Sequence, residues 1–261
     1  MRIELATAPG DPERPNEDFA SVALPASGKG GALVLLDGVT PPRTGTGCMH
    51  SVPWFTARLG GTLGELSVSR RDMTLPEVLA AALARTAEAH ASTCDLSHLR
   101  TPQATVVLAR WDAERVEYLV LSDSVLLLAG PTGEVTPVLD DRLTWVPRAS
   151  LVSDEVADAT VRNREGGFFT AAADPAVAAR AVTGSLPRCG VRALAALTDG
   201  AGRWVEKFHQ GDWADCLAVV AKEGPQSLID RVRALESADT DRAHLGRSKT
   251  HDDAAVVYAE L

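Results

Sequence analysis

Acidic residues recur in this sequence at the ends of short apolar segments. They are Glu17-Asp18 before residues 19–24, Asp37-Gly38 after 32–36, Asp123 between 116–121 and 125–129, Asp199-Gly200 after 191–197, and Asp252-Asp253 before 254–259. If these segments are strands that share a sheet, their ends can gather several carboxylates at one point. Ionised carboxylates held close together repel one another, and a divalent cation removes that cost. Ligation by oxygen alone, without neighbouring His or Cys, favours Mg²⁺ or Mn²⁺ over Zn²⁺.

Each of these sites also has an ordinary structural interpretation. Asp-Gly is a common turn sequence, and a single Asp beside a strand is often a loop residue or a helix cap. Asp37-Gly38 is nevertheless a poor hairpin turn, because the Val-Thr-Pro-Pro sequence at 39–42 cannot continue a ladder of hydrogen bonds. Gly38 would also let its backbone carbonyl approach closely enough to join a coordination shell. Five such sites in one chain therefore favour a metal centre.

The elements that must position these carboxylates are short strands and a few longer helices. Strands are expected at residues 3–6, 19–24, 32–36, 104–109, 116–121, 125–129, 191–197 and 254–259, which are rich in Val and Leu and bounded by Gly, Pro, Asp or Ser. The stretch 104–138 is interpreted as a meander, with turns at 112–114 and 131–133.

The helices are indicated by apolar spacing and by capping residues. Apolar residues from Val52 to Leu66 recur at spacings of three and four, and Thr74 with Glu77 forms a capping box that starts a helix reaching to about residue 90. A third helix is predicted to start at Asp174-Pro175 and to end before Gly184, and a last one starts at Gly224-Pro225. Because the helices cluster in pairs, the order favours an α+β layered domain over a doubly wound parallel sheet.

Residues 139–172 carry few periodic signals, and a stretch of this kind in a compact domain is often a functional flap. Asp140-Asp141-Arg142, at its start, is interpreted as a solvated loop. The length of 261 residues is consistent with one domain over 1–261.

Composition excludes several classes of protein. Hydrophobic residues make up 45% of the chain and charged residues 23%, which is typical of a globular domain. The formal charge of −9 disfavours nucleic acid and anionic membrane surfaces as partners. No apolar run reaches the roughly 20 residues that a membrane helix needs, and the N-terminus lacks a signal-peptide core, so a cytoplasmic location is expected.

The four cysteines are interpreted as free structural thiols in a reducing cytosol. Cys48, Cys94, Cys189 and Cys216 form no Cys-x-x-Cys pair. Cys48 and His50 lie close in the sequence, but no fourth ligand stands at zinc-like spacing from them.

Taken in order, the acidic motifs resemble those of the metal-dependent serine/threonine protein phosphatases, the PPM or type 2C family. The motifs are Arg14-Pro15-Asn16-Glu17-Asp18, Val34-Leu35-Leu36-Asp37-Gly38, Pro102-Gln103-Ala104-Thr105-Val106, Ser122-Asp123-Ser124, Leu197-Thr198-Asp199-Gly200 and Asp252-Asp253. Each motif is weak alone, but six in order from residue 14 to 258 are a strong signal.

The resemblance implies a four-layer α-β-β-α sandwich of two antiparallel sheets flanked by paired helices. It also implies two Mn²⁺ or Mg²⁺ ions bridged by water, with a third, looser ion in many bacterial members. Asp37 would bridge both ions and the Gly38 carbonyl would complete one shell. The remaining implied ligands are Asp199 and Asp252 at the first ion, Glu17 and Asp18 at the second side, and Asp123 with Asp199 at the third. Arg14 would hold the substrate phosphate.

The sequence departs from the family pattern mainly around the substrate. Val39-Thr40-Pro41-Pro42 replaces the usual continuation after Asp-Gly, so the histidine that some members place there is missing; His50 is a weak substitute. Arg14 lies one residue nearer Glu17 than the usual arginine, which leaves Arg2 and Arg43 as alternatives for binding phosphate. Arg247-Ser248-Lys249 is either a source of positive charge near the metals or a solvated loop.

The function expected from the resemblance is hydrolysis of phosphoserine and phosphothreonine in proteins. In that reaction a water bridged between two divalent cations attacks phosphorus in line. The alternative is a catalytically degenerate, phosphatase-like regulatory or binding module, which the altered stretch after Gly38 supports. Hydrolysis of small phosphorylated metabolites would use the same ions and stays open. The sequence does not indicate an oligomeric state.

Overall fold

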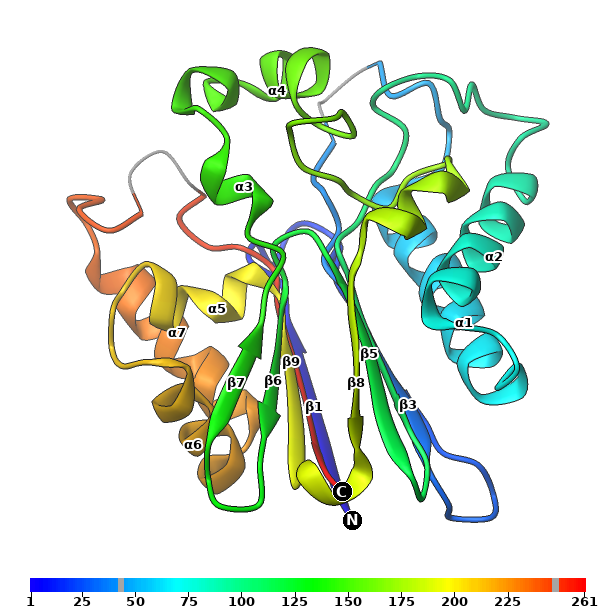
Figure 1. Ribbon diagram of the computed structural model, residues 1–261. Coiled ribbons are helices and arrows are strands. Elements are labelled where there is room, and N and C mark those ends of the chain that lie inside the picture. Colours follow the sequence, from blue (N-terminus) through cyan, green and yellow to red (C-terminus); the bar gives the residue numbers. More distant parts are fainter. Residues whose placement is uncertain (42–44, 246–248) are drawn as a thin grey trace.

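The computed structural model describes residues 1–41, 45–245 and 249–261 and contains two five-stranded sheets packed face to face (Figure 1). Neighbouring strands are antiparallel throughout both sheets. One sheet has the order β1 (Arg2–Ala8), β10 (Ala254–Glu260), β9 (Ala193–Leu197), β6 (Val125–Ala129) and β7 (Val135–Val138). The other has the order β2 (Phe19–Ala23), β3 (Gly31–Leu36), β4 (Val106–Trp111), β5 (Arg115–Leu121) and β8 (Val182–Pro187).

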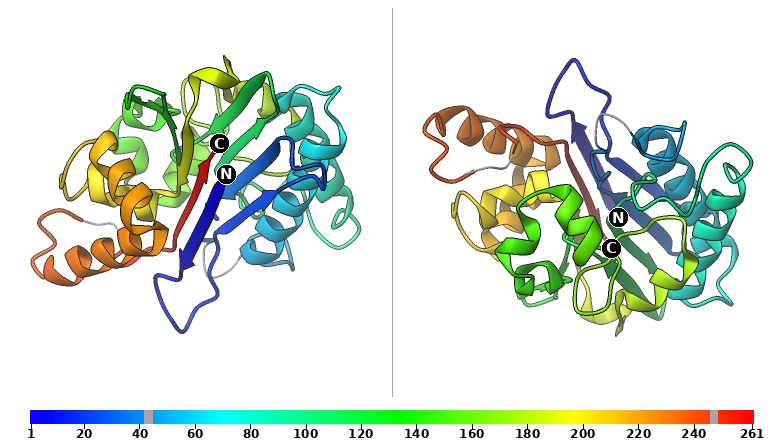
Figure 2. Two further views of the ribbon diagram at one scale, coloured as in Figure 1. Left: turned by 90° about the horizontal axis from the view of Figure 1, so that it is seen from below. Right: turned by 90° about the horizontal axis from the view of Figure 1, so that it is seen from above.

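Helices cover the outer face of each sheet. One outer layer consists of α1 (Val52–Ser69) and α2 (Leu75–Glu88), and the other of α5 (Asp199–Glu206), α6 (Trp213–Glu223) and α7 (Pro225–Ala238). Viewed along the sandwich, β1 and β10 lie side by side at the centre with the two termini together (Figure 2). The predicted α-β-β-α sandwich is therefore confirmed. Among the described residues, no helix combines the length and apolarity needed to cross a membrane.

Strand alternation builds the core in three layers. In β3, Leu33 and Leu35 point between the sheets, whereas Val34 and Leu36 pack against the α1–α2 layer. In β9, Leu194 likewise points between the sheets, while the neighbouring alanines face α5 to α7. Successive side chains of a strand point to opposite faces, so strands buried on both sides read as continuous apolar runs.

The capping signals give the helices the starts that the sequence predicts. Thr74 accepts a hydrogen bond from the Glu77 backbone, and the Glu77 carboxylate accepts one from the Thr74 backbone N–H at 2.7 Å. Ser51 caps α1 in the same way through the Trp54 backbone, and Pro225 begins α7.

Two predictions about connections are wrong. The stretch 104–138 is not one meander, because β5 and β6 belong to different sheets, although the turns expected at 112–114 and 131–133 do join β4 to β5 and β6 to β7. Ser122 adopts a left-handed φ of 70° at that point, which turns the chain from one sheet into the other. The helix after Asp174-Pro175 is only a 3-10 helix, η2 (Pro175–Arg180), and Gly184 lies inside β8. There Gly184 is opposite Tyr118, whose ring occupies the space that a Cβ would need.

The stretch 139–172 crosses one end of the sandwich and contains only short helices (Figure 1). These are α3 (Arg142–Trp145), η1 (Arg148–Leu151) and α4 (Asp154–Thr160); another short helix, η3 (Arg188–Gly190), follows β8. The interpretation of 140–142 as a solvated loop is wrong for Asp140, which is buried. Its carboxylate accepts hydrogen bonds from the Ser122 backbone at 2.8 Å and from Arg142. This buried ion pair fixes the base of the stretch beside the turn between the two sheets.

Candidate metal centre

The cleft at this end of the sandwich is lined by the ends of strands from both sheets. Because neighbouring strands are antiparallel, the last residue of β3 lies at the same end as the first residues of β2 and β4. The last residue of β9 likewise lies at the same end as the first residues of β6 and β10. A cleft of about 540 Å³ opens here, and its lining includes Asp37, Asp123, Asp199 and Asp252.

Asp37 directly follows β3, and its backbone continues the hydrogen-bond pairing of β3 with β4. Its backbone N–H donates to Thr105 Oγ1 at 3.2 Å, and its carbonyl accepts the Thr105 N–H at 2.9 Å. Thr105 Oγ1 in turn lies 2.6 Å from Ser124 Oγ. A Cβ at Gly38 would meet the Glu17 carbonyl oxygen at 2.5 Å, so only glycine fits between the two segments. Gly38 therefore packs directly against the backbone of Glu17.

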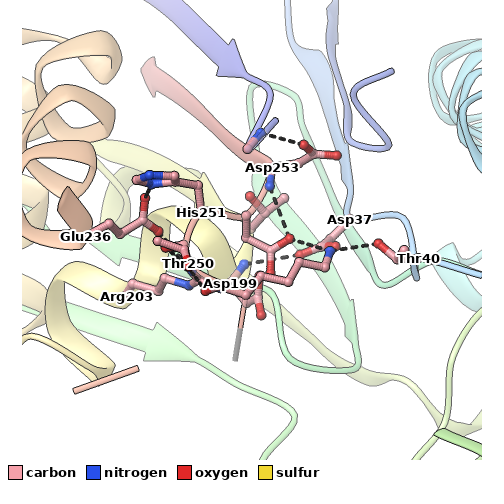
Figure 3. Close-up of polar contacts among 12 residues, drawn as sticks. Asp37, Thr40, Asp199, Arg203, Glu236, Thr250, His251 and Asp253 are labelled. Carbon is pink, nitrogen blue, oxygen red and sulfur yellow. Dashed lines mark hydrogen bonds and ion pairs between the residues drawn. The ribbon is translucent and has the colours of Figure 1, made fainter. Parts of the chain in front are cut away.

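Two hydrogen bonds between the sheets position Asp199 and Asp18 at this end of the sandwich. The Asp199 backbone N–H, at the start of α5, donates to Asp37 Oδ2 at 3.3 Å (Figure 3). Thr198 Oγ1 donates to Asp18 Oδ2 at 3.0 Å, which joins the end of β9 to the residue before β2. Asp18 Oδ1 is buried and has no hydrogen-bond partner among the described residues.

Asp37, Asp18 and Asp199 have the electrostatics of buried carboxylates that lie close to one another. Burial raises the pKa of Asp37 well above its ordinary value, and the charges of Asp18, Asp199, Asp123 and Asp252 raise it further. Burial likewise raises the pKa of Asp18, and it raises that of Asp199 to about 6 with help from Asp123 and Asp252. A divalent cation would stabilise the ionised forms. The unpartnered Asp18 oxygen, the tight fit at Gly38 and the oxygen-only donors all fit a hard ion.

Asp252 differs from the others because two cationic side chains already contact it. Arg203 Nη2 lies 3.0 Å from Asp252 Oδ2, and Lys249 Nζ lies 2.7 Å from Oδ1. Lys249 also donates to Thr40 Oγ1 at 2.7 Å, and Thr40 donates to Glu17 Oε2 at 2.5 Å. The two oxygens of Asp252 are thus shared between a buried guanidinium and a half-exposed ammonium.

A buried network behind Asp252 holds Arg203 in place (Figure 3). Arg203 Nη1 donates to Glu236 Oε1 at 2.6 Å, and Glu236, on α7, is fully buried. Glu236 Oε2 also contacts Arg233 Nη1 at 2.7 Å and His251 Nδ1 at 2.8 Å. The sequence offered no periodic signal for this network, because its members come from α5, α7 and the segment before β10.

The N-terminal motif lies beside the cleft and not within its deepest part. Asp253 accepts the backbone N–H groups of Gly10 at 2.8 Å and of Glu17 at 2.7 Å, so it fixes this segment against β10. Arg14 is exposed and lines an adjoining cavity together with Glu17. Thr40, Lys249 and Asp252 line both cavities.

The other phosphate-binding candidates lie elsewhere. Arg2 pairs with Glu4 at 2.7 Å and donates to the Ala221 carbonyl, at the end of β1 remote from the cleft, so it is no substitute for Arg14. Arg43, Arg247 and Ser248 lie outside the described residues. His50 is not among the residues that line the cleft and instead contacts Cys94. This position agrees with the interpretation of His50 as a weak substitute for the histidine missing after Gly38.

No protein-family model matches the sequence, and no curated protein matches it significantly. The fold, in contrast, matches solved bacterial phosphatases over the whole chain. The Mycobacterium tuberculosis serine/threonine phosphatase PstP/Ppp aligns with a TM-score of 0.63 at 16% identity, covering 100% of this chain and 98% of that one. This chain has the fold of the PPM serine/threonine phosphatases.

Two other structures with the PPM fold give the same result. Staphylococcus aureus Stp1 aligns with a TM-score of 0.60 at 14% identity, covering 99% of this chain and 94% of that one. The PPM Ser-Thr phosphatase MsPP from Mycobacterium smegmatis, solved with cacodylate, aligns at 0.56 and 17% identity over 100% and 98% of the two chains. The TM-scores and coverage establish the shared PPM fold. Because the identities are only 14–17%, the chemistry must be argued from the residues.

Proposed function

We propose that this protein is a divalent-metal-dependent phosphatase that hydrolyses phosphoserine and phosphothreonine in proteins. The observation that carries the proposal is the convergence of buried carboxylates from both sheets, one of which, Asp18, has an oxygen without a partner. The PPM fold supports the reaction class, because the similar structures are named as serine/threonine phosphatases.

Mn²⁺ or Mg²⁺ would be held by the residues that the family resemblance implies. Asp37 would be shared by two ions and the Gly38 carbonyl would complete one shell; Asp199 and Asp252 would serve the first ion, Glu17 and Asp18 the second side, and Asp123 with Asp199 a third, looser ion. When bound, a pair of such ions lowers the pKa of a shared water and screens a phosphate dianion. The hydrogen bond from the Asp199 backbone fixes the orientation of the Asp37 carboxylate.

Substrate contacts would come from the rim of the cleft. Arg14 is exposed beside Glu17, and its guanidinium matches the geometry of phosphate oxygens. Lys249 adds a second positive charge between the two cavities. The segment 139–172 forms one wall of the cleft, through Leu143, Ser153 and other residues, and we assign it the role of a flap over the substrate.

The test is release of phosphate from a phosphothreonine peptide with and without Mn²⁺. We expect Mn²⁺-dependent turnover that D37N abolishes, because this variant removes the charge shared between the proposed ions. D72N is the matched control, since Asp72 is exposed and pairs with Arg70, away from the cleft. Absence of turnover in protein shown to bind Mn²⁺ would refute the proposal, as would an unchanged rate in D37N.

One observation favours the second candidate, a degenerate phosphatase-like binding module. Arg203 and Lys249 already supply two positive charges to Asp252, so part of the carboxylate charge is balanced without an ion. Calorimetric titration with Mn²⁺ separates the two candidates, because an enzyme should bind at two or more sites and a degenerate module weakly or not at all. Turnover of a small phosphate monoester but not of phosphopeptides would instead indicate a metabolite phosphatase.

A further inference from the structure

A second group of metal-ligating side chains lies outside the cleft. Cys48, His50, His90 and Cys94 place one ligand atom each within 4.8 Å of all the others. Cys48 Sγ lies 3.4 Å from His90 Nδ1 and 3.8 Å from His50 Nδ1, and His50 Nδ1 lies 3.3 Å from Cys94 Sγ. The two sulfurs are 2.9 Å apart and both thiols are free. In the sequence the pairs are separated by 39 intervening positions, which explains why no zinc-like spacing is visible.

The helical hairpin brings the two halves of this cluster together. Cys48 and His50 lie just before α1, which begins after its cap Ser51. His90 and Cys94 lie just after α2, in a turn that includes a hydrogen bond from the Thr93 N–H to the His90 carbonyl. Residues four apart in a coiled segment share one face. The start of α1 and the end of α2 are neighbours because the two helices run antiparallel (Figure 1).

Aromatic packing holds the two imidazoles in place. Trp54 stacks on His50 with ring centroids 4.0 Å apart and lies 5.2 Å from His90. His90 is 1% exposed, and its Nδ1 faces Cys48 Sγ, while its Nε2 is buried with no partner among the described residues. An ion bound at Nδ1 would satisfy the nitrogen that faces the two sulfurs and would leave Nε2 as the protonated ring nitrogen.

The distances match the requirements of one tetrahedral ion. Four ligands at the usual zinc bond lengths are separated from one another by about 3.3–3.8 Å. The three sulfur–nitrogen distances of 3.3, 3.4 and 3.8 Å fall in that range, and the two sulfurs would have to separate by about 0.9 Å to reach it. Two thiolates and two imidazoles select Zn²⁺ over the hard ions suited to carboxylates.

We propose that Cys48, His50, His90 and Cys94 form a structural zinc site. Four protein ligands leave no open position, which is the arrangement of structural and not of catalytic zinc. The ion would tie the residues just before α1 to those just after α2.

The test is the metal content and the cobalt spectrum of the full-length protein. The wild-type chain, offered Zn²⁺ under reducing conditions and then gel-filtered, should retain about one zinc per chain at this site. With Co²⁺ it should show a sulfur-to-cobalt charge-transfer band, which carboxylate ligands cannot produce. C48S/C94S should lose both signals, and C189S, which removes an exposed cysteine elsewhere, should keep them.

Further measurements separate this site from the carboxylate centre. D37N should keep the sulfur-to-cobalt band whether or not the protein is a phosphatase. If C48S/C94S does not fold, the wild-type cobalt spectrum still decides the question. The proposal is overturned if that band is absent, if C48S/C94S retains full zinc, or if mass spectrometry finds Cys48 and Cys94 joined as a disulfide in protein prepared with zinc.

Discussion

Lys249 would compete with the proposed metal ion for Asp252, and this competition can be measured. Its ammonium lies 2.7 Å from Asp252 Oδ1 and also donates to Thr40. The charge of Asp252 and the hydrogen bond to it raise the pKa of Lys249 against the opposing effect of burial, so the group is a cation at neutral pH. We therefore expect Lys249→Met to tighten Mn²⁺ binding, because it frees one carboxylate oxygen and removes a repelling charge.

The size of the effect follows from the exposure of the pair. The Lys249 side chain is 46% exposed, and exposed ion pairs contribute about 0–1 kcal/mol. Repulsion between an ammonium and a dication about 5 Å away costs about 2 kcal/mol at the dielectric constant of water, and salt reduces this. Together these terms amount to about 1–2 kcal/mol, which corresponds to about five- to thirtyfold tighter binding.

The assay is calorimetric titration of metal-free protein with Mn²⁺ at fixed ionic strength. Lys222→Met is the matched control, because Lys222 is an exposed lysine on α6 that lines neither cavity. The Mn²⁺ affinity of this variant should equal that of the wild type. Circular dichroism confirms that both variants fold. If Lys249→Met binds Mn²⁺ no more tightly than Lys222→Met, the ion does not use the oxygen that Lys249 contacts and the assignment of Asp252 is wrong.

Three further predictions follow from the same region. Arg203→Met should lower the free energy of unfolding by about 3 kcal/mol in urea titrations, because it removes a buried cation shared by Glu236 and Asp252, whereas the exposed-pair control Arg231→Met should cost less than about 1 kcal/mol. Equal losses would contradict the network described here. Gly38→Ala should abolish most Mn²⁺-dependent activity, because a Cβ at this position meets the Glu17 carbonyl oxygen at 2.5 Å. The control Gly61→Ala places its Cβ in open space on α1 and should keep the activity. Unchanged activity in Gly38→Ala would argue against a close approach of the two backbones. Because burial raises the pKa of Asp199 from 3.8 to about 6, this carboxyl binds more protons in the metal-free fold than in the unfolded chain; its contribution to stability should therefore fall as pH rises from about 4 to about 6, and saturating Mn²⁺ should suppress that fall. A thermal midpoint that, measured against that of Asp199→Asn, does not fall over that interval would contradict the raised pKa.

Strands and helices with strong local signals were predictable from the sequence. The apolar runs that became β3, β9 and β10 are buried on both faces, so they stand out as continuous hydrophobic segments. The capping box at Thr74 marked the start of α2 for a local reason, because both partners lie within one helical turn. The edge strand β8 had no such signal, since its side chains are largely exposed and it includes Thr, Gly and Pro.

The sequence by itself determined that acidic residues stand at strand ends, because that depends only on neighbours along the chain. Tertiary structure alone decided which of them meet, since the pairing of β9 with β10 and β6 brings Asp199 to the Asp37 carboxylate from the opposite sheet. It also decided that Asp252 is shared by Arg203 and Lys249, and that Cys48 meets Cys94 across the α1–α2 hairpin. Contacts between distant positions depend on strand order and helix packing, which no local pattern encodes.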